Sequence, residues 1–267
     1  MDFGGGIVRV ALLISYRGTR YAGWQRQPNR PTVQAAIEDA LFEATGKTTV
    51  IHASGRTDAG VHAYGQVAHF DTESAIPAEN FAVMLNRLLP PDIRIRASAA
   101  VGGSFHARKC AVTKTYVYRV LITPIENALE WDTAYSFRFP VMIEPMQKAA
   151  RLLTGQHDFA SFYSQGSTAA TTERTLTELS VDIAEGKVSS DGFLHVGEIR
   201  IRATADGFLY NMVRVLAAQL IEVGQGRKSP DDLQRIMSLK NRALAKECAP
   251  PQGLYLVGVD YGLQIFS

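Results

Sequence analysis

The sequence has only two cysteines in 267 residues, Cys110 and Cys248, and they form no closely spaced pair of the kind that binds zinc. So few cysteines exclude a disulfide-stabilised scaffold and favour a reducing compartment, which we expect to be the cytoplasm. Since there is no run of about 18 apolar residues, no membrane-spanning helix and no membrane partner are expected. Residues 1–6 lack the basic and apolar segments of a signal peptide and are expected to form a flexible tail.

Motifs for common cofactors and metals are also missing. Gly46-Lys47-Thr48 resembles part of a phosphate-binding loop, but Leu41 stands where that loop needs a glycine. Gly224-Gln225-Gly226 lacks the third glycine of a dinucleotide-binding turn. The histidines show neither an HExxH pattern nor close paired spacing. The sequence therefore predicts no metal site and no bound cofactor.

Carboxylates are absent from two long stretches, residues 3–37 and 93–125, although the formal net charge of the whole chain is only +2. The basic residues of these stretches are Arg9, Arg17, Arg20, Arg26 and Arg30 in the first, and Arg94, Arg96, Arg108, Lys109, Lys114 and Arg119 in the second. Such segregation predicts a basic face on a nearly neutral molecule, which is typical of proteins that bind a polyanion such as RNA. Chance clustering on a solvated surface is the alternative.

The hydrophobic content of 46% is sufficient for a folded core. In the first hundred residues, the periodicity predicts alternating strands and helices. The predicted elements are strand 7–16, a helix capped by Thr32 and Gly46, strands 50–51 and 66–70, helix 77–89 and strand 93–97. This order is typical of an α+β half that resembles an RNA-recognition module.

A small-residue, glycine-containing segment near residues 98–105 is the expected boundary, giving an N-terminal half, 7–104, and a C-terminal half, 105–267. In the second half, the alternation of residues 113–121 predicts a strand that places Tyr116 and Tyr118 on one face. The other predicted elements are helix 145–153, strands 175–183 and 194–204, helix 209–224, a helix capped at Ser229 and strand 254–259.

Asp58 is the only carboxylate between Glu43 and Asp71. It lies in the segment Gly55-Arg56-Thr57-Asp58-Ala59-Gly60, whose glycines allow a tight loop to approach a ligand closely. An aspartate in a turn often only hydrogen-bonds its own backbone, and the spacing alone favours this structural role.

Several segments in a fixed order are similar to those of one enzyme family. They are Gly18-Thr19-Arg20-Tyr21-Ala22-Gly23-Trp24-Gln25-Arg26-Gln27, Gly55-Arg56-Thr57-Asp58-Ala59-Gly60-Val61-His62-Ala63, Leu85-Asn86-Arg87-Leu88-Leu89-Pro90, Phe105-His106-Ala107-Arg108, Lys114-Thr115-Tyr116-Val117-Tyr118, His157-Asp158-Phe159, Asn211-Met212-Val213-Arg214 and Ala249-Pro250-Pro251-Gln252-Gly253-Leu254. From about residue 7 to residue 261, the chain resembles the tRNA pseudouridine synthase A family.

This resemblance implies an α+β fold of two ferredoxin-like halves, whose antiparallel sheets join into one extended sheet with helices on one side and an RNA-binding cleft on the other. It implies an isomerase that converts uridine to pseudouridine in the anticodon stem-loop of tRNA by base flipping. It also implies a homodimer that needs no cofactor, with one tRNA lying across both subunits.

The resemblance also assigns roles to individual residues. Asp58 is expected to be the nucleophile and Arg214 the cation that keeps it ionised. Tyr116 is expected to stack on the target uracil, Arg56 to enter the RNA helix as the base leaves, and Leu254 to pack against the flipped base. The expected RNA-binding surface contains Arg17, Arg20, Arg26, Arg108 and Lys109.

Two departures from the family pattern are visible. Arg17 stands where the family usually has an acidic or amide residue, and residues 109–112 differ from the commoner aromatic-Ser-Ala pattern. Both changes fall on expected RNA-contact surface, so they affect the choice of tRNA rather than the chemistry. The alternatives to the enzyme are a non-catalytic RNA-binding relative, which an altered Asp58 would have indicated, and a metabolic enzyme acting on a small anion, which a concentrated phosphate loop would have indicated.

Overall fold

The computed structural model describes residues 6–164 and 170–266 and divides them into two compact units. Unit 1 contains the described residues up to Val112 together with those from Leu256 onward, and unit 2 contains those from Thr113 to Tyr255. The expected N-terminal tail lies outside the described residues except for Gly6.

The sheet of unit 1 is built around β1 (Val8–Tyr16), which pairs antiparallel with β3 (His62–Thr72) on one side and β4 (Ile93–Val101) on the other. The short β2 (His52–Ala53) pairs with β3, and β12 (Leu254–Asp260) is the next strand beyond β3. The central position of β1 confirms the prediction made from its apolar residues, since a strand covered on both faces needs no polar alternation.

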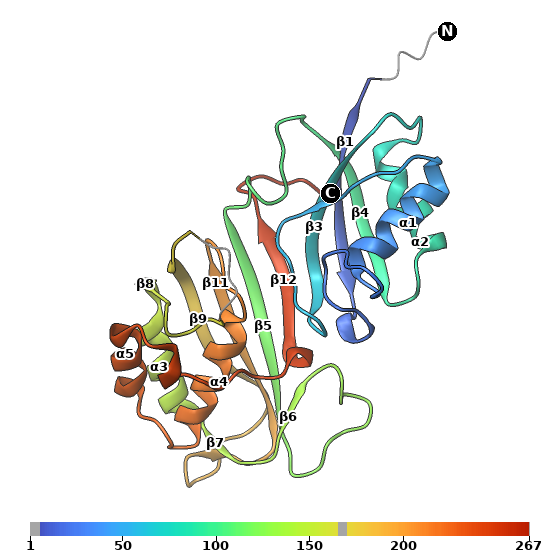
Figure 1. Cartoon of the computed structure of the whole chain (residues 1–267). Helices are drawn as coiled ribbons and strands as arrows, with labels where there is room; N and C mark the ends of the chain where they lie inside the picture. The colour runs from blue at the N-terminus through green and yellow to red at the C-terminus, as the bar shows by residue number, and fades with distance from the viewer. Residues whose placement is uncertain (1–5, 165–169, 267) are drawn as a thin grey trace. The chain divides into compact units, whose positions relative to one another are not determined.

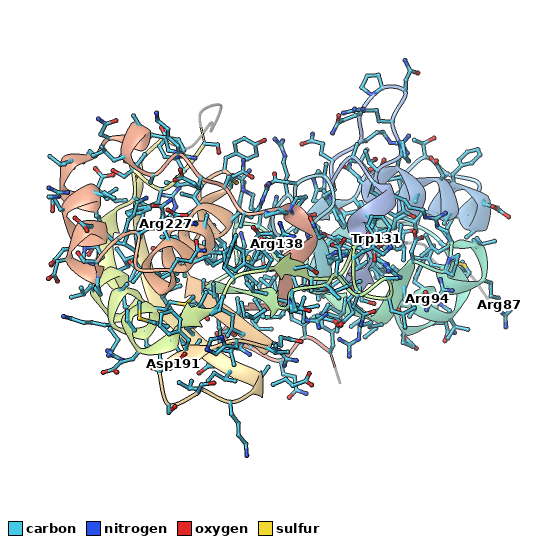
Figure 2. The ribbon with its side chains drawn as sticks, turned by 90° about the horizontal axis from the view of Figure 1, so that it is seen from below. Arg87, Arg94, Trp131, Arg138, Asp191 and Arg227 are labelled. Carbon is cyan, nitrogen blue, oxygen red and sulfur yellow. The ribbon has the colours of Figure 1, made fainter. Side chains whose placement is uncertain are left out.

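Two helices, α1 (Val33–Thr45) and α2 (Phe81–Leu88), lie side by side on this sheet (Figure 1). The predicted caps of α1 are confirmed: the Thr32 side chain accepts a hydrogen bond from the Ala35 amide at 3.3 Å, and Gly46 ends the helix with a left-handed backbone. After α2, the Arg94 guanidinium donates to the Pro90 carbonyl at 2.7 Å (Figure 2). Two short 3₁₀ turns, η1 (Gly18–Arg20) and η2 (Ala78–Asn80), precede α1 and α2.

The sheet of unit 2 has the strand order β5-β11-β9-β8, with antiparallel pairing throughout. Its strands are β5 (Thr113–Ile122), β8 (Gly155–Asp158), β9 (Glu173–Gly186) and β11 (Gly197–Ala205). The short strand β6 (Tyr135–Phe137) adds parallel to β5, while β7 (Val141–Met142) and β10 (Phe193–Leu194) form a separate pair. Tyr116 and Tyr118 of β5 are both buried, and so is Val117 between them.

Three helices of unit 2, α3 (Ile143–Leu153), α4 (Met212–Gly224) and α5 (Pro230–Leu239), pack together near β8 and β9 (Figure 1). Nearly every side chain of α4 is buried, which makes it the central helix of this unit. The predicted cap of α5 is confirmed, since Ser229 and Asp232 exchange hydrogen bonds in a capping box. The 3₁₀ turns η3 (Arg242–Leu244) and η4 (Pro251–Gly253) lie between α5 and β12.

Some element boundaries differ from the predictions. The strand expected at residues 50–51 is β2, shifted to His52–Ala53, because pairing with His69 and Ala68 of β3 determines which residues join the sheet. The helix expected over residues 77–89 divides into η2 and α2. The strands β6, β7 and β8 were not expected, because such short segments carry little periodic signal.

The chain is therefore a mixed α/β protein in which sheets and helices occur in both units. Within the described residues, no helix has the length and apolar character needed to cross a membrane.

Candidate active site

Asp58 lies in unit 1 on the loop between β2 and β3. The start of this loop is anchored to β3 at both the backbone and the side chains. The Ser54 amide donates to the Val67 carbonyl at 2.7 Å, and the Ser54 hydroxyl donates to the Gln66 side-chain oxygen at 2.7 Å. The Gln66 side-chain amide in turn donates to the Gly55 carbonyl at 2.8 Å. These bonds fix the backbone immediately before Arg56.

Thr57, the residue before Asp58, is buried and held on two sides. Its hydroxyl shares a hydrogen bond of 2.7 Å with the Tyr16 hydroxyl, and its carbonyl accepts one of 3.0 Å from the Trp24 amide. Burial raises the pKa of the Tyr16 hydroxyl to about 12, so this group stays protonated. The Asp58 carbonyl then accepts a bond of 3.1 Å from the Val61 amide, which closes the turn.

Gly23 allows the chain to approach this loop closely. Its φ of +95° favours glycine, and a Cβ placed on it would lie 2.7 Å from the Thr57 carbonyl oxygen and 3.1 Å from the Asp58 carbonyl carbon. No side chain fits at this position without moving the loop. The segment around Gly23 thus forms one wall against which the backbone of Asp58 rests.

On this rigid loop, Asp58 is half-buried and Arg56 is exposed. A half-buried carboxylate is accessible to a ligand and is still partly shielded from water, which suits a nucleophile. The exposed guanidinium of Arg56, on the same loop, can bind a polyanion such as RNA. The structure thus brings Asp58 and Arg56 together within unit 1.

Tyr116 lies on β5 in unit 2 and is 8% exposed. Its ring meets the ring of Phe208 edge to face, with 5.1 Å between centroids. Tyr118, two residues further along the strand, is fully buried and donates its hydroxyl to the Pro250 carbonyl at 2.7 Å. The expectation that Tyr118 is the core residue of this pair is consistent with its complete burial.

Arg214 lies in the first turn of α4 and is half-buried. Its Nε donates to the Ala249 carbonyl and one terminal nitrogen donates to the Asn211 side-chain oxygen, both at 2.7 Å. The Ala249 amide donates back to the Arg214 carbonyl at 3.1 Å. The guanidinium is therefore positioned by the segment after η3 as well as by its own helix.

Leu254 begins β12 directly after η4 and is 5% exposed. Tyr116, Arg214 and Leu254 thus belong to unit 2, whereas Asp58 and Arg56 belong to unit 1. Within unit 2, the positive charge of Arg214 reaches Tyr118, where it opposes the burial that raises the pKa of that tyrosine.

The basic residues expected to bind RNA differ in their surroundings. Arg20 forms an ion pair of 2.7 Å with Asp92, and Arg26 pairs at 2.7 Å with both Glu38 and Asp39. Both guanidinium groups therefore have part of their charge neutralised within unit 1.

Arg17, Arg108 and Lys109 are exposed. The backbone amides of Arg108 and Lys109 donate to Nδ1 of His106, which leaves their side chains at the surface.

Sequence reasoning missed the residues that hold these groups in place. Tyr16, Gly23 and Gln66 secure the Asp58 loop, and Asn211 secures Arg214. The only sequence signal was that Gly23 and Asn211 lie in the family-like segments. Among the described residues, no three His, Cys, Asp or Glu side chains form a group that could hold a metal ion.

A family model described as tRNA pseudouridine synthase matches residues 12–108 and 149–262. A tRNA pseudouridine synthase A from Acetivibrio thermocellus is 42% identical over 94% of this chain and 99% of its own length. The protein of that name from Caldicellulosiruptor saccharolyticus is 41% identical over 94% of this chain and 99% of its own length. The one from Shouchella clausii is 42% identical over 97% of this chain and 95% of its own length. The chain belongs to the tRNA pseudouridine synthase A family.

As a member of this family, the protein is an isomerase that converts uridine to pseudouridine in tRNA. The residues that the family model matches lie in both units and include Asp58 and Arg214, whereas Tyr116 lies between the two matched ranges. A solved Cas6 complex with a substrate mimic covers 95% of this chain and 99% of its own at 11% identity, but its TM-score of 0.19 is too low to carry an argument.

Proposed function

We propose that Asp58 is the catalytic carboxylate of the uridine isomerisation. The observation that carries this assignment is a half-buried aspartate on a loop that is hydrogen-bonded to β1, β3 and the Gly23 segment. In the reaction, the C1′–N1 bond of uridine breaks, the uracil turns, and a C1′–C5 bond forms. C5 loses a proton and N1 gains one, so the reaction exchanges no electrons. A carboxylate acting at the sugar or the base is the one nucleophilic group it needs.

We further propose that Arg56 helps to displace the target base. It is exposed and lies two residues before Asp58, so it can follow the base out of the helix while the loop stays fixed. Removing a base from the stack costs a few kcal/mol, and a side chain that fills the gap offsets part of this cost.

The groups of unit 2 supply the rest of the proposed site. Arg214 pairs with Asp58 in this proposal, because a cation favours the ionised carboxylate against the desolvation of a closed site. Tyr116 stacks on the uracil and its hydroxyl serves proton transfer at C5, while Leu254 packs against the flipped base. The burial of both Tyr116 and Leu254 supports an apolar environment for a base.

We propose the anticodon stem-loop as the substrate region, bound by Arg17, Arg20, Arg26, Arg108 and Lys109 across an RNA-binding cleft. The two halves, 7–104 and 105–267, are proposed to be ferredoxin-like, with their sheets joined into one. A cytoplasmic homodimer that binds one tRNA across both subunits completes the proposal, and light scattering of the protein with and without tRNA measures this stoichiometry. Since the isomerisation is redox-neutral, chelator treatment should leave its rate unchanged.

The decisive experiment replaces Asp58 by asparagine, which keeps the shape of the side chain and removes its charge and nucleophilicity. We expect pseudouridine formation, mapped by carbodiimide modification of the tRNA, to fall by at least about 10³-fold while tRNA binding is kept. Asp182→Asn is the matched control, because Asp182 is exposed in unit 2 and its carboxylate accepts a hydrogen bond of 3.0 Å from the Ser180 hydroxyl. Near-normal turnover by Asp58→Asn would refute the assignment.

A further inference from the structure

Three histidines from separate segments of unit 1 gather at one place. The rings of His52 on β2, His69 on β3 and His106 after β4 lie with centroids 4.8 to 5.9 Å apart. His69 is 2% exposed, His106 is half-buried and His52 is exposed, so the cluster leads from the sheet to the surface. We call these three residues the histidine cluster. The mechanism proposed above does not use it.

Backbone hydrogen bonds decide which nitrogens of the cluster carry protons. Nδ1 of His69 accepts from the Ala107 amide at 3.2 Å, and Nδ1 of His106 accepts from the Arg108 amide at 3.2 Å. A neutral imidazole whose Nδ1 accepts must hold its proton on Nε2. Among the described residues, neither Nε2 has a hydrogen-bond partner, so two N–H donors remain for a ligand.

The segment that carries His106 is firmly placed. Phe105 and Ala107, on either side of it, are buried against Ala11 and Val67 of the sheet. The Tyr261 hydroxyl also donates to the Ala107 carbonyl at 2.8 Å. Because Phe105 and Ala107 are fixed in the core, the backbone of His106 between them is held in place, and its ring lies beside the other two rings.

The charged groups that face the cluster, two cations and one carboxylate, leave a net positive charge. Arg9 of β1 and Lys109 of the 105–112 segment both act on the cluster electrostatically. The facing carboxylate, Asp71, is already bound to Arg9 through two hydrogen bonds of 2.7 Å. The remaining titratable neighbour, Cys110, accepts a hydrogen bond from the His106 amide at 3.3 Å. Such surroundings suit an anion better than a cation.

We propose that the histidine cluster, together with Lys109, is a proton-linked binding site for a backbone phosphate of the tRNA. The His69 and His106 imidazoles donate through Nε2 to the phosphate oxygens, and they take up protons as the complex forms. The proposal rests on tRNA as the substrate and adds a site whose residues the proposed catalysis does not use. Its consequence is that tRNA affinity increases as the pH falls through the range in which histidine titrates.

The direction of this effect follows from the charges. In the free protein, burial and then repulsion by the positive charges that His106, Arg9 and His52 carry when protonated lower the pKa of His69 to about 4. Burial, Lys109 and His52 likewise lower the pKa of His106. These rings are therefore neutral at neutral pH before RNA binds. A bound phosphate opposes the cations and raises the pKa values, so protons are taken up on binding and acid strengthens the complex.

The test compares the wild-type protein with the double variant His69→Asn, His106→Asn. Asparagine keeps an acceptor near the position of Nδ1, so the bonds from the Ala107, Arg108 and Lys109 amides can persist. For the wild type in phosphate-free buffer, we expect tRNA affinity to rise about tenfold from about pH 7.5 to about pH 6. The plot of log affinity against log salt should also become steeper by about one unit at the lower pH. The double variant should show less than about a twofold pH effect.

His195→Gln is the matched control, because His195 is exposed in unit 2 and its ring bonds at 2.8 Å to Asp191, which is labelled in Figure 2. It should keep the full pH effect. An equal pH effect in wild type and double variant, or a loss of affinity of the same size at both pH values, would overturn the proposal. Pseudouridine formation by the wild type is measured in parallel. If the wild type makes product but shows no difference from the double variant, the histidine proposal fails and the proposed function stands. If the wild type makes no product, the proposed function itself fails.

Discussion

The candidate catalytic groups of the two units are held in place by different means. Asp58 lies on a loop, and its backbone position depends on hydrogen bonds from Tyr16, Trp24 and Gln66, which come from other segments. Arg214 lies on the regular helix α4, whose backbone fixes the position of its Cα and Cβ atoms. Hydrogen bonds to Ala249 and Asn211 then orient the guanidinium.

This difference shows where each part of the site is vulnerable. A loop can place a nucleophile accurately only if distant residues restrain it, so substitutions far from the substrate can displace it. A helix supplies most of that rigidity through its own hydrogen bonds, so substitutions there act mainly through the side chain that is changed. The predictions below test this contrast.

Among the substitutions that test this contrast, Gly23→Ala has the largest expected effect. The new Cβ would lie 2.7 Å from the Thr57 carbonyl oxygen, on a backbone with φ of +95°. The Asp58 loop must move to relieve this contact, and a displacement of about 1 Å can cost about 10²-fold in rate. We expect a loss of this size in single-turnover pseudouridine formation by a protein that still folds, as judged by circular dichroism.

Gly46→Ala is the matched control for this substitution. Gly46 also has a positive φ, +69°, but a Cβ there meets nothing within 4 Å. It should lower the free energy of unfolding by about 1 kcal/mol and leave the rate unchanged. Equal activities for the two variants would show that close approach to the loop is unimportant.

The same contrast explains what the sequence could predict. Asp58 stands alone in a stretch without other carboxylates, and Arg214 is the only charged residue between Asp206 and Glu222, so both stand out in the local pattern, but only the family resemblance assigns them a catalytic role. The helix caps at Thr32 and Ser229 are equally local, and the structure confirms them. Such features depend on residues within one or two turns of each other.

Contacts between segments that are distant in the sequence could not be predicted from local patterns. The approach of Gly23 to Thr57 and the bond from Arg214 to Ala249 depend on how distant segments pack. The histidine cluster joins three segments, and its members show no spacing pattern in the sequence. The position of β2 was misplaced for the same reason, because its register is set by its partner strand.

Substitution of Arg214 should have the second largest effect. Loss of the proposed cationic partner makes Asp58 harder to ionise, so Arg214→Ala should move the acid limb of the pH–rate profile to higher pH. On that acid limb, we expect the rate at a given pH to fall by about tenfold, since one pKa unit changes the ionised fraction by this factor when the pH lies below the pKa. An unchanged profile would place Arg214 away from Asp58.

Arg56→Ala should have a smaller effect of a different kind. It should slow turnover by about tenfold on a stem uridine without moving the pH profile, because it acts on base displacement. On a substrate whose target uridine is unpaired, the loss should shrink to about twofold, since flipping is then easier. Single-turnover rates on paired and unpaired substrates check this, and a shifted profile would exchange the roles of Arg56 and Arg214.

The smallest effect concerns stability and is confined to unit 1. Burial and neighbouring cations lower the pKa of His69 to about 4 in the folded protein, below the usual 6.5. A lowered histidine pKa stabilises the neutral form, so this contribution is intact above about pH 6.5 and is lost as the pH falls towards 4. By about pH 5, the free energy of unfolding should have fallen by about 2 kcal/mol relative to pH 7.5.

Fluorescence can follow this loss in unit 1 alone. The sequence has two tryptophans, buried Trp24 in unit 1 and exposed Trp131 in unit 2 (Figure 2), so a Trp131→Phe background reports on unit 1. In urea titrations of this background, His69→Asn should remove most of the pH dependence, because asparagine retains an acceptor for the Ala107 amide and does not titrate. Its stability at pH 7.5 should be lower, but the slope with pH is the decisive quantity. A slope equal to that of the parent would assign the acid sensitivity of unit 1 to groups other than His69.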